Sequence, residues 1–195
     1  MRNIFILACA LLIAVSVILI AGQQPQTQET MVTPVELTAP APIRIHIPEE
    51  PDMDGIVYSD EIPLSYGLQL HAQLVCREYG VPYSLMLGLM ETESSFREDA
   101  DSGWAFGLCQ IGYINEDWLA EQGLDIRRTV DNIEAAGLIL GDYLSRYDVP
   151  QALMAYNCGE YGASELWEQG IYESEYSRTV LDAAHKWEET IHDRP

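Results

Sequence analysis

Two glutamates near the middle of the chain lie on different faces of a predicted helix. If the segment from Pro82 to Phe96 is helical, at about 100° per residue, Glu93 falls near the centre line of an apolar stripe. Apolar surroundings raise the pKa of a carboxyl, and a carboxyl that keeps its proton near neutral pH can act as a general acid. Glu91 falls on the opposite face and is expected to be solvated. Periodicity alone leaves an alternative open, namely that Glu93 is also an ordinary solvated residue at a fraying helix end.

The helix that carries Glu93 is expected to belong to an all-α domain. Helical periodicity continues from about Pro63 to the end of the chain, and no Val/Ile-rich alternating run is long enough for a sheet. Glycines and prolines mark the helix ends, and residues 101–115 are expected to form a loop with at most short helical turns. The helices are predicted at 64–79, 82–96, 116–122, 129–147, 150–159, 163–169 and 174–192.

The charge of the chain argues against two classes of partner. The sequence has 31 Asp and Glu residues and 10 Lys and Arg residues, a formal net charge of −21. A protein that binds nucleic acid needs a basic face to neutralise phosphates, so no nucleic-acid partner is expected. Adsorption to anionic lipid headgroups is disfavoured for the same reason. We interpret most of the acidity as a means of keeping the protein soluble.

Three of the four cysteines, Cys76, Cys109 and Cys158, lie in the body of the chain. None of them has the CxxC spacing of a zinc site, so neither a metal nor another cofactor is expected. One disulfide between two of the three is compatible with the sequence, but spacing does not give its pairing. We expect free, buried thiols.

The first 61 residues differ from the rest of the chain. Residues 4–22 are apolar and uncharged, and as a helix they would span about 28 Å, close to the thickness of a bilayer's hydrocarbon core. Because Arg2 precedes this run, the positive-inside rule places the rest of the chain outside the cytoplasm. We predict a single-pass cell-membrane anchor at 1–22, a flexible Pro/Gln/Thr-rich linker at 23–61 and a folded domain at 62–195. A cleaved signal peptide, which would give a secreted protein, is the alternative.

Three motifs follow one another through the predicted domain. They are Glu93-Ser94-Ser95-Phe96, then Gly107-Leu108-Cys109-Gln110 with Ser102 in the loop before it, and then Ala155-Tyr156-Asn157-Cys158-Gly159. In this order and spacing they resemble the soluble lytic transglycosylase domain, a family akin to goose-type lysozyme. The resemblance covers Ile62 to Trp187, and it is strengthened by Asn132-Ile133 and Tyr176-Ser177.

The resemblance implies a lysozyme-like fold and peptidoglycan glycan strands as the substrate. Ser102 and Gln110 resemble cleft residues that contact the sugar. Tyr156 resembles a tyrosine that orients the catalytic acid or the sugar, with Asn157 beside it. Tyr176 is a weaker match among the substrate-binding residues.

Glu93 resembles the single catalytic acid of the family. In the implied reaction it protonates the leaving oxygen of the β-1,4 bond between N-acetylmuramic acid and N-acetylglucosamine, while the N-acetyl group stabilises the cationic carbon. The C6 hydroxyl of the muramic acid then attacks, Glu93 accepts its proton, and a 1,6-anhydro ring closes. An anchored domain on a tether would act on the wall outside the cell, and a secretion or conjugation apparatus of the envelope is a candidate partner.

Two segments depart from the family's common pattern. Ser102-Gly103-Trp104-Ala105 stands where the family has Ser-Pro-x-Gly-Ala and is one residue shorter. The residues after Gln110, IGYINEDW, stand where Met-Pro-x-Thr is commoner. Both departures resemble a subgroup found in Gram-positive bacteria and their mobile elements, and they concern the sugar subsites rather than the acid.

Two other functions stay open. Glu98, Asp99 and Asp101 follow the Glu93 helix, and a second catalytic carboxylate among them would give a goose-type lysozyme-like hydrolase. Such an acidic run is more often a solvated face. The other alternative is a wall-binding scaffold module of a secretion or conjugation apparatus with little turnover. An intact catalytic set argues against it, because a protein that only binds has no need of a buried acid.

Overall fold

The computed structural model of the protein describes residues 54–192. The predicted membrane anchor at 1–22 and most of the predicted linker lie outside these residues. Between residues 54 and 192, no helix combines the length and the apolar composition that crossing a membrane requires.

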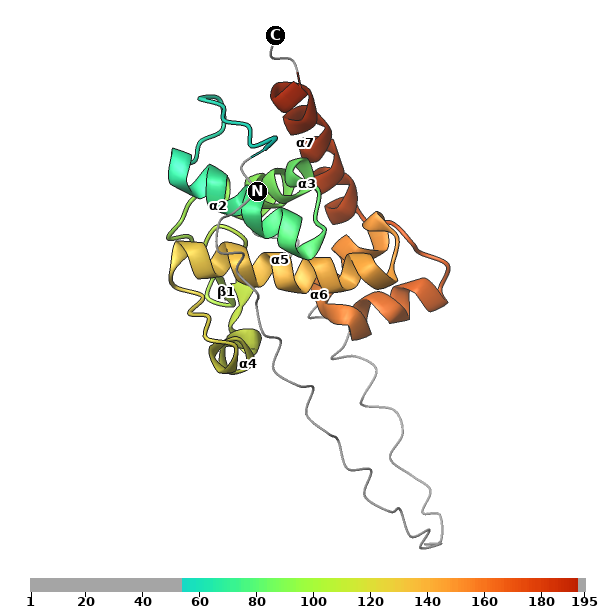
Figure 1. The fold of residues 1–195 in the computed structure, drawn as a ribbon. Helices are drawn as coiled ribbons and strands as arrows, with labels where there is room; N and C mark the ends of the chain where they lie inside the picture. The colour runs from blue at the N-terminus through green and yellow to red at the C-terminus, as the bar shows by residue number, and fades with distance from the viewer. Residues whose placement is uncertain (1–53, 193–195) are drawn as a thin grey trace, which may run out of the picture. The chain divides into compact units, whose positions relative to one another are not determined.

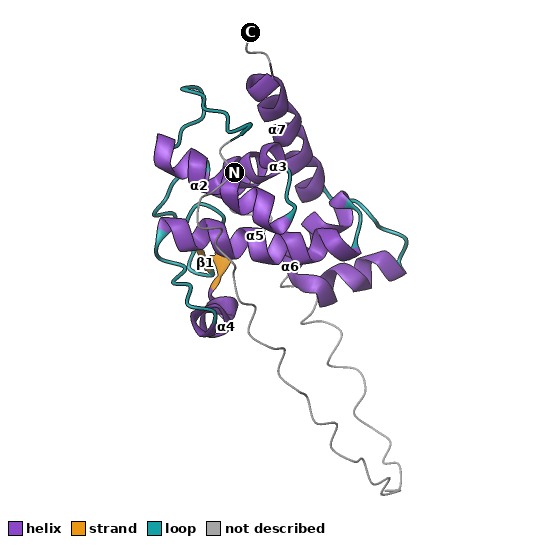
Figure 2. Ribbon diagram, viewed as in Figure 1, coloured by secondary structure: helices purple, strands orange, loops and turns teal. Residues whose placement is uncertain are grey.

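Helices dominate the described residues, which confirms the predicted all-α class (Figure 2). In Figure 1, α5 crosses the middle of the domain, with α2 and α3 on one side of it and α4 and the strand β1 on the other. Two-residue strands, β1 (Ala105–Phe106) and β2 (Ile111–Gly112), form an antiparallel ribbon that is too short to be predicted from alternation. The 3-10 helix η1 covers Tyr113–Asn115. The α-helices are α2 (Tyr66–Tyr79), α3 (Tyr83–Ser94), α4 (Glu116–Glu121), α5 (Thr129–Arg146), α6 (Val149–Glu168) and α7 (Glu175–His192).

Element α6 consists of two helical segments that meet at a kink. The helices expected at 150–159 and 163–169 are joined in α6, which bends at Gly159. Gly159 has a φ of 75° and a ψ of 156°, a conformation that glycine adopts readily because it has no Cβ. The helix is therefore interrupted at Gly159, the residue at which the sequence predicts the first of these helices to end.

Helix α3 is enclosed by the rest of the domain. Six successive residues from Leu85 to Met90 are buried, so the helix has no single apolar stripe with a solvated face opposite. The face that carries Glu91 is solvated only in part, because α7 covers the rest of it. Gly88 lies so close to α7 that a Cβ on it would be 2.6 Å from the Val180 carbonyl oxygen. Figure 1 shows α3 and α7 packed side by side.

The last residues of the predicted linker are attached to α2 by two glutamine side chains. Gln73 accepts a hydrogen bond from the Val57 amide (2.8 Å) and donates one to the Val57 carbonyl (2.7 Å). Gln69 makes the same pair of bonds to the backbone of Ser59, at 3.1 and 2.9 Å. Both glutamines are buried, so each pair satisfies a buried amide and joins the incoming chain to the first helix.

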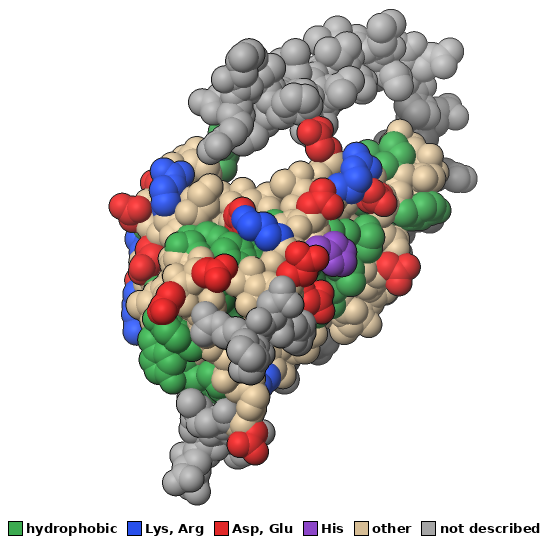
Figure 3. Space-filling view, turned by 90° about the horizontal axis from the view of Figure 1, so that it is seen from above, with side chains coloured by type: hydrophobic (Ala, Val, Ile, Leu, Met, Phe, Trp, Pro, Cys, Tyr) green, Lys and Arg blue, Asp and Glu red, His purple; other side chains and the backbone are tan. Residues whose placement is uncertain are grey.

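On the face that Figure 3 shows, acidic side chains are scattered rather than gathered in one patch. The ion pairs that they form are mostly exposed, as in Arg178 and Glu173, whose charged atoms are 3.0 Å apart. Exposed pairs of this kind contribute at most about 1 kcal/mol each. The distribution fits the interpretation of the acidity as a determinant of solubility.

We predict that Gly88→Ala lowers the free energy of unfolding by about 2–3 kcal/mol, because the added methyl group meets the α7 backbone at Val180 and Ala184. Gly67→Ala is the matched control, since nothing lies within 4 Å of a Cβ at that helical position. The control should be neutral or more stable by up to about 1 kcal/mol. Urea unfolding of the two variants measures both values, and equal stability would contradict the close packing of α3 on α7.

Candidate active site

Glu93 lies in the last turn of α3, where its carboxylate meets a tyrosine of α7. The Tyr176 hydroxyl donates a hydrogen bond to Glu93 Oε1, and both residues are half-buried. The helix ends directly after Glu93 and Ser94, two residues earlier than predicted. It ends there because Ser95 and Phe96 take left-handed conformations, with φ of 54° and 60°. This sharp ending fixes Glu93 at the boundary between the helix and the loop that follows.

Burial raises the pKa of Glu93 from 4.5 to about 7, and the hydrogen bond from Tyr176 offsets part of that rise. Near neutral pH the carboxyl is therefore close to half protonated. A group in this state can donate a proton in one step and accept one in the next. Burial, together with the nearby Glu93 carboxylate, raises the pKa of Tyr176 well above its ordinary value, so Tyr176 remains a hydrogen-bond donor.

Glu91 is only partly solvated: 34% of its side chain is exposed, and the rest contacts α7. Its carboxylate accepts a hydrogen bond of 2.6 Å from the indole N–H of Trp187, which is buried on α7, and one of 3.4 Å from Lys186. The Trp187 ring also packs edge-to-face on Phe96, with ring centroids 5.5 Å apart. Glu91 and Phe96 therefore tie the end of α3 to α7 on either side of Glu93.

One buried asparagine holds the loop between α3 and α4. Asn132 of α5 is completely buried and donates to the carbonyls of Phe106 (2.8 Å) and Ile126 (3.0 Å), and it accepts from the Cys109 amide at 2.9 Å. Gly107 has a φ of 84°, and a Cβ on it would lie 2.4 Å from the Asn132 side chain. The glycine is therefore required both by its backbone conformation and by the close approach of Asn132.

Gln110 and Ser102 stabilise the same loop. The Gln110 side chain donates to the carbonyls of Ala100 (2.9 Å) and Gly107 (3.0 Å). The Ser102 hydroxyl is exposed and accepts from the Ala105 amide at 3.1 Å, which is a turn contact. Gln110 also lines the groove described below, and Ser102 does not. Both residues thus have a structural role, and only Gln110 is placed to touch a ligand in that groove as well.

Tyr156 and Asn157 come from α6. The Tyr156 hydroxyl donates to the Cys109 carbonyl at 2.8 Å and not to Glu93, so the expectation that it could bond the carboxyl is wrong. Burial raises the pKa of Tyr156 well above its ordinary value, and the nearby Cys109 and Glu93 add to the rise. The tyrosine is thus close to the acid although Tyr176 supplies the hydrogen bond. Asn157 is exposed and faces the groove.

A groove of about 750 Å³ runs beside this group of residues. One wall comes from β1, β2, η1 and α4, and the other from α5 and α6. Tyr156 and Gln110 line it, and Glu93 is near enough to Tyr156 to raise the pKa of that phenol. A volume of this size suits an extended ligand of several rings rather than a metal ion.

The acidic residues after α3 are engaged in the surface structure. Glu98 accepts a hydrogen bond of 2.8 Å from the Thr129 hydroxyl, and Asp101 accepts one of 2.7 Å from the Gly103 amide. Both residues and Asp99 are exposed. In residues 54–192, no cluster of three or more His, Cys, Asp or Glu side chains could hold a metal ion.

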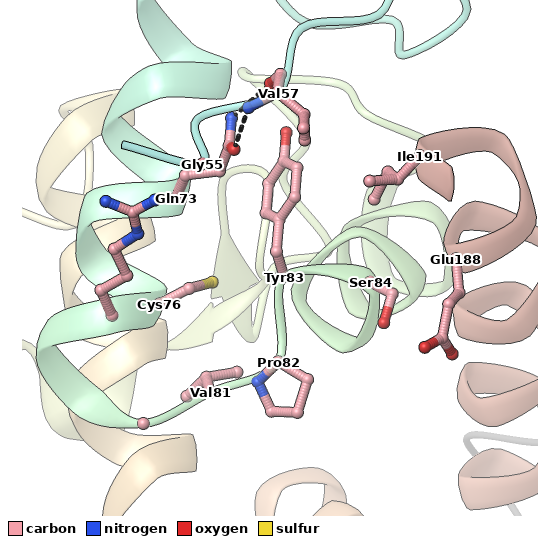
Figure 4. Close-up of a pocket in the computed structure, with 12 residues that line it drawn as sticks. Gly55, Val57, Gln73, Cys76, Val81, Pro82, Tyr83, Ser84, Glu188 and Ile191 are labelled. Atoms are coloured by element: carbon pink, nitrogen blue, oxygen red, sulfur yellow. Dashed lines mark hydrogen bonds between the residues drawn. The ribbon is translucent and has the colours of Figure 1, made fainter. Parts of the chain in front are cut away.

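A second cavity, of about 580 Å³, lies where the incoming chain, the start of α3 and the end of α7 meet (Figure 4). It holds the Cys76 thiol, whose pKa burial raises to about 12, and the Tyr83 ring. A thiol with so high a pKa stays protonated and is a poor nucleophile. Glu93 lines neither cavity, but it is close to Tyr156, which lines the groove and not this cavity, so we assign the chemistry to the groove. All three cysteines in the described residues are free, but Cys158 is exposed and not buried as expected.

The sequence did not indicate that Asn132 supports the loop. It also did not indicate that Trp104 and Trp118 line the groove. An asparagine on the core-facing side of a long predicted helix indicates a buried side chain that bonds nearby backbone groups. The two tryptophans carried no such signal, because their position depends on how the loop folds.

Comparison with known proteins gives two matches of different kinds. A sequence model of the family described as "Transglycosylase SLT domain" matches residues 73–177. Among solved structures, the chain is similar to the X-ray structure of an inactive mutant of the lytic transglycosylase Slt from Pseudomonas aeruginosa, with a TM-score of 0.57 and 19% sequence identity. The match covers 69% of this chain and 25% of that one, so this chain spans about a quarter of the length of its structural relative. At this identity the likeness shows the fold. Among curated protein sequences no match was found.

The raised pKa of Glu93 predicts a stability that depends on pH. Between 4.5 and about 7 the folded state binds more protons than the unfolded chain, so stability falls as the pH rises through that window. Glu93→Gln removes this dependence. We expect the variant to match the wild type near pH 4 and to be more stable by about 2 kcal/mol at pH 8.

Urea unfolding at several pH values measures this difference. Glu189→Gln is the control, because Glu189 is exposed on α7 and its replacement should not change the shape of the stability curve. A constant offset between Glu93→Gln and the wild type across pH 4–8 would show that Glu93 is not desolvated.

Proposed function

Because the chain belongs to the transglycosylase SLT domain family and has its helical, lysozyme-like fold, we propose that the domain is a peptidoglycan lytic transglycosylase. It cleaves the β-1,4 bond between N-acetylmuramic acid and N-acetylglucosamine and leaves a 1,6-anhydro ring. The observation that carries the proposal is the half-buried Glu93, whose pKa is about 7 and which Tyr176 holds beside the groove.

In the first step, Glu93 donates its proton to the oxygen that leaves as the C1–O bond breaks. The N-acetyl group of the muramic acid stabilises the positive charge at C1. In the second step, the C6 oxygen of the same sugar bonds to C1 and its proton passes to the Glu93 carboxylate. The acid is thereby restored, no water is consumed, and the hydrogen bond from Tyr176 stabilises the ionised form between the two steps.

A reaction with one carboxylate fits the surroundings of Glu93. Glu98 and Asp101 bond to Thr129 and to the Gly103 amide, at the exposed surface. A hydrolase would need a second carboxylate or an activated water to attack C1. The goose-type lysozyme-like hydrolase is therefore the second candidate, and the products distinguish the two.

We further propose that the domain acts outside the cell. The support is the sequence pattern of a membrane anchor at 1–22 and a linker at 23–61, which would hold the domain at a distance from the membrane. Glycan strands of the wall would then be the partner, with a secretion or conjugation apparatus as the setting. A scaffold with little turnover in such an apparatus would need no half-protonated acid.

The products of wall digestion test the reaction. We expect the purified domain to release muropeptides that end in 1,6-anhydro-N-acetylmuramic acid, identified by mass. Glu93→Gln should lower the rate by about a hundredfold or more, because it keeps the shape and removes the proton. Glu189→Gln should keep the wild-type rate. Products with reducing muramic acid ends would favour the hydrolase, and wild-type turnover in Glu93→Gln would exclude Glu93 as the acid.

The pH dependence of the reaction tests the role of Tyr176. We expect kcat/KM to fall above about pH 7 as Glu93 loses its proton. Tyr176→Phe removes a hydrogen bond that lowers the pKa of Glu93, so the alkaline limb should move to higher pH. Tyr156→Phe is the comparison, because the Tyr156 hydroxyl bonds to the Cys109 carbonyl instead and its loss should leave the limb in place. A limb that does not move in Tyr176→Phe would contradict the proposed contact.

A further inference from the structure

One wall of the groove carries large apolar side chains that are left in contact with solvent. Trp104 is 80% exposed, Trp118 is 41% exposed and Ile114 is 93% exposed, and all three line the groove. They come from successive parts of the chain: the turn before β1, the 3-10 helix η1 and the helix α4. Adjacent exposed apolar groups of this kind mark a binding surface more often than single scattered ones do.

The other two tryptophans of the described residues are placed differently. Trp187 is buried, and Trp167 is half-buried and packs on the Tyr147 ring. An aromatic ring gains more from burial than any other side chain, yet Trp104 contributes little to the core. Its exposure is therefore compatible with a ligand that covers it.

The turn that carries Trp104 is held in place before any ligand binds. The Trp104 carbonyl accepts a bond of 2.9 Å from the Tyr113 amide. The Ser102 hydroxyl accepts from the amides of Trp104 (3.4 Å) and Ala105 (3.1 Å), and Asp101 accepts from the Gly103 amide at 2.7 Å. A side chain on so constrained a backbone loses less entropy when a ligand packs on it.

The charge of the groove indicates what kind of ligand it takes. The chain has 31 acidic residues, but Asp142 is the one charged side chain among those that line the groove, and it is paired with Arg146 at 2.5 Å. Amide side chains of Gln110, Asn115 and Asn157 supply the polar lining. Such a surface suits an uncharged ligand with an apolar face and with hydroxyl or amide groups at its edges.

We propose that Trp104 and Trp118 form a stacking subsite that binds N-acetylated sugar rings of the glycan strand through their C–H faces. The proposal rests on the proposed function, since it makes the groove the path of the strand. It also assigns a role to the shortened turn at Ser102–Ala105: the turn presents Trp104 as a sugar contact. Uncharged, acetylated stretches of glycan would be bound in preference to de-N-acetylated ones, whose amines carry charge.

Binding of a chitin hexasaccharide, an uncharged oligomer of N-acetylglucosamine, to the Glu93→Gln protein tests the proposal without turnover. Titration calorimetry should give a Kd that changes little between about 50 and 500 mM NaCl, because few charges line the groove. Trp104→Ala in this background should raise the Kd about tenfold or more, and Trp104→Phe should restore most of the affinity. Trp118→Ala should weaken binding by a smaller factor, since Trp118 is less exposed.

Tyr66→Ala is the matched control. Tyr66 is 53% exposed on α2 and does not line the groove, so its loss should leave the Kd unchanged. Near-UV circular dichroism and the melting temperature confirm that each variant is folded. Unchanged binding in Trp104→Ala, or no binding by the parent protein, would overturn the proposal.

The outcomes separate this proposal from the proposed function. If the wild type releases anhydro products while Trp104→Ala binds the hexasaccharide normally, the stacking subsite is wrong and the reaction stands. If the wild type cleaves no wall but binds the oligomer in a Trp104-dependent way, the subsite stands and the transglycosylase assignment fails. A de-N-acetylated hexamer that binds as tightly as the acetylated one at about 500 mM NaCl would contradict the preference for uncharged sugar.

Discussion

The desolvated carboxyl of Glu93 is the feature on which the rest of the site depends. It requires a helix that is buried on nearly every side, because an exposed helix end would leave the acid in water with an ordinary pKa. Close packing at Gly88 lets α7 reach α3. The same helix α7 brings Tyr176 to the carboxylate and Trp187 to Glu91. One packing arrangement thus supplies both the burial, which raises the pKa of Glu93, and the hydrogen bond from Tyr176, which lowers it.

The other half of the site is supported by polar contacts instead of a large sheet. Asn132 bonds two backbone groups of the loop that holds the short β1–β2 ribbon, and a third, the Ile126 carbonyl, in the segment before α5. This loop places the Cys109 carbonyl, to which Tyr156 binds, and Gln110, which lines the groove. A single buried amide therefore connects α5 and α6 with the wall that carries Trp104.

The sequence predicted this site only in part, and the limits have physical causes. Glu93 and its helix followed from periodicity and a motif, since both are local. The surroundings of Glu91 did not, because periodicity describes one helix and cannot show that α7 covers it. The exchange of roles between Tyr156 and Tyr176 has the same origin, since the partner of a hydroxyl depends on how α6 and α7 dock. The helix end at Gly159 followed from the glycine itself, but the second helix starts directly after it, which needs a backbone angle that a glycine permits and does not by itself specify.

The two glutamines of α2 have a mechanical consequence. A pull on the N-terminal end of the chain would meet the bond from Arg77 to the Asp54 carbonyl and then the paired bonds from Gln73 to Val57 and from Gln69 to Ser59, all of them made by α2. Each glutamine holds the chain through a donor and an acceptor together, so both bonds of a pair must break in the same event. The tension would be carried into α2, while the carboxylate of Glu93 and its tyrosine are on α3 and α7. A load on the chain before the domain would thus fall first on a helix that does no chemistry.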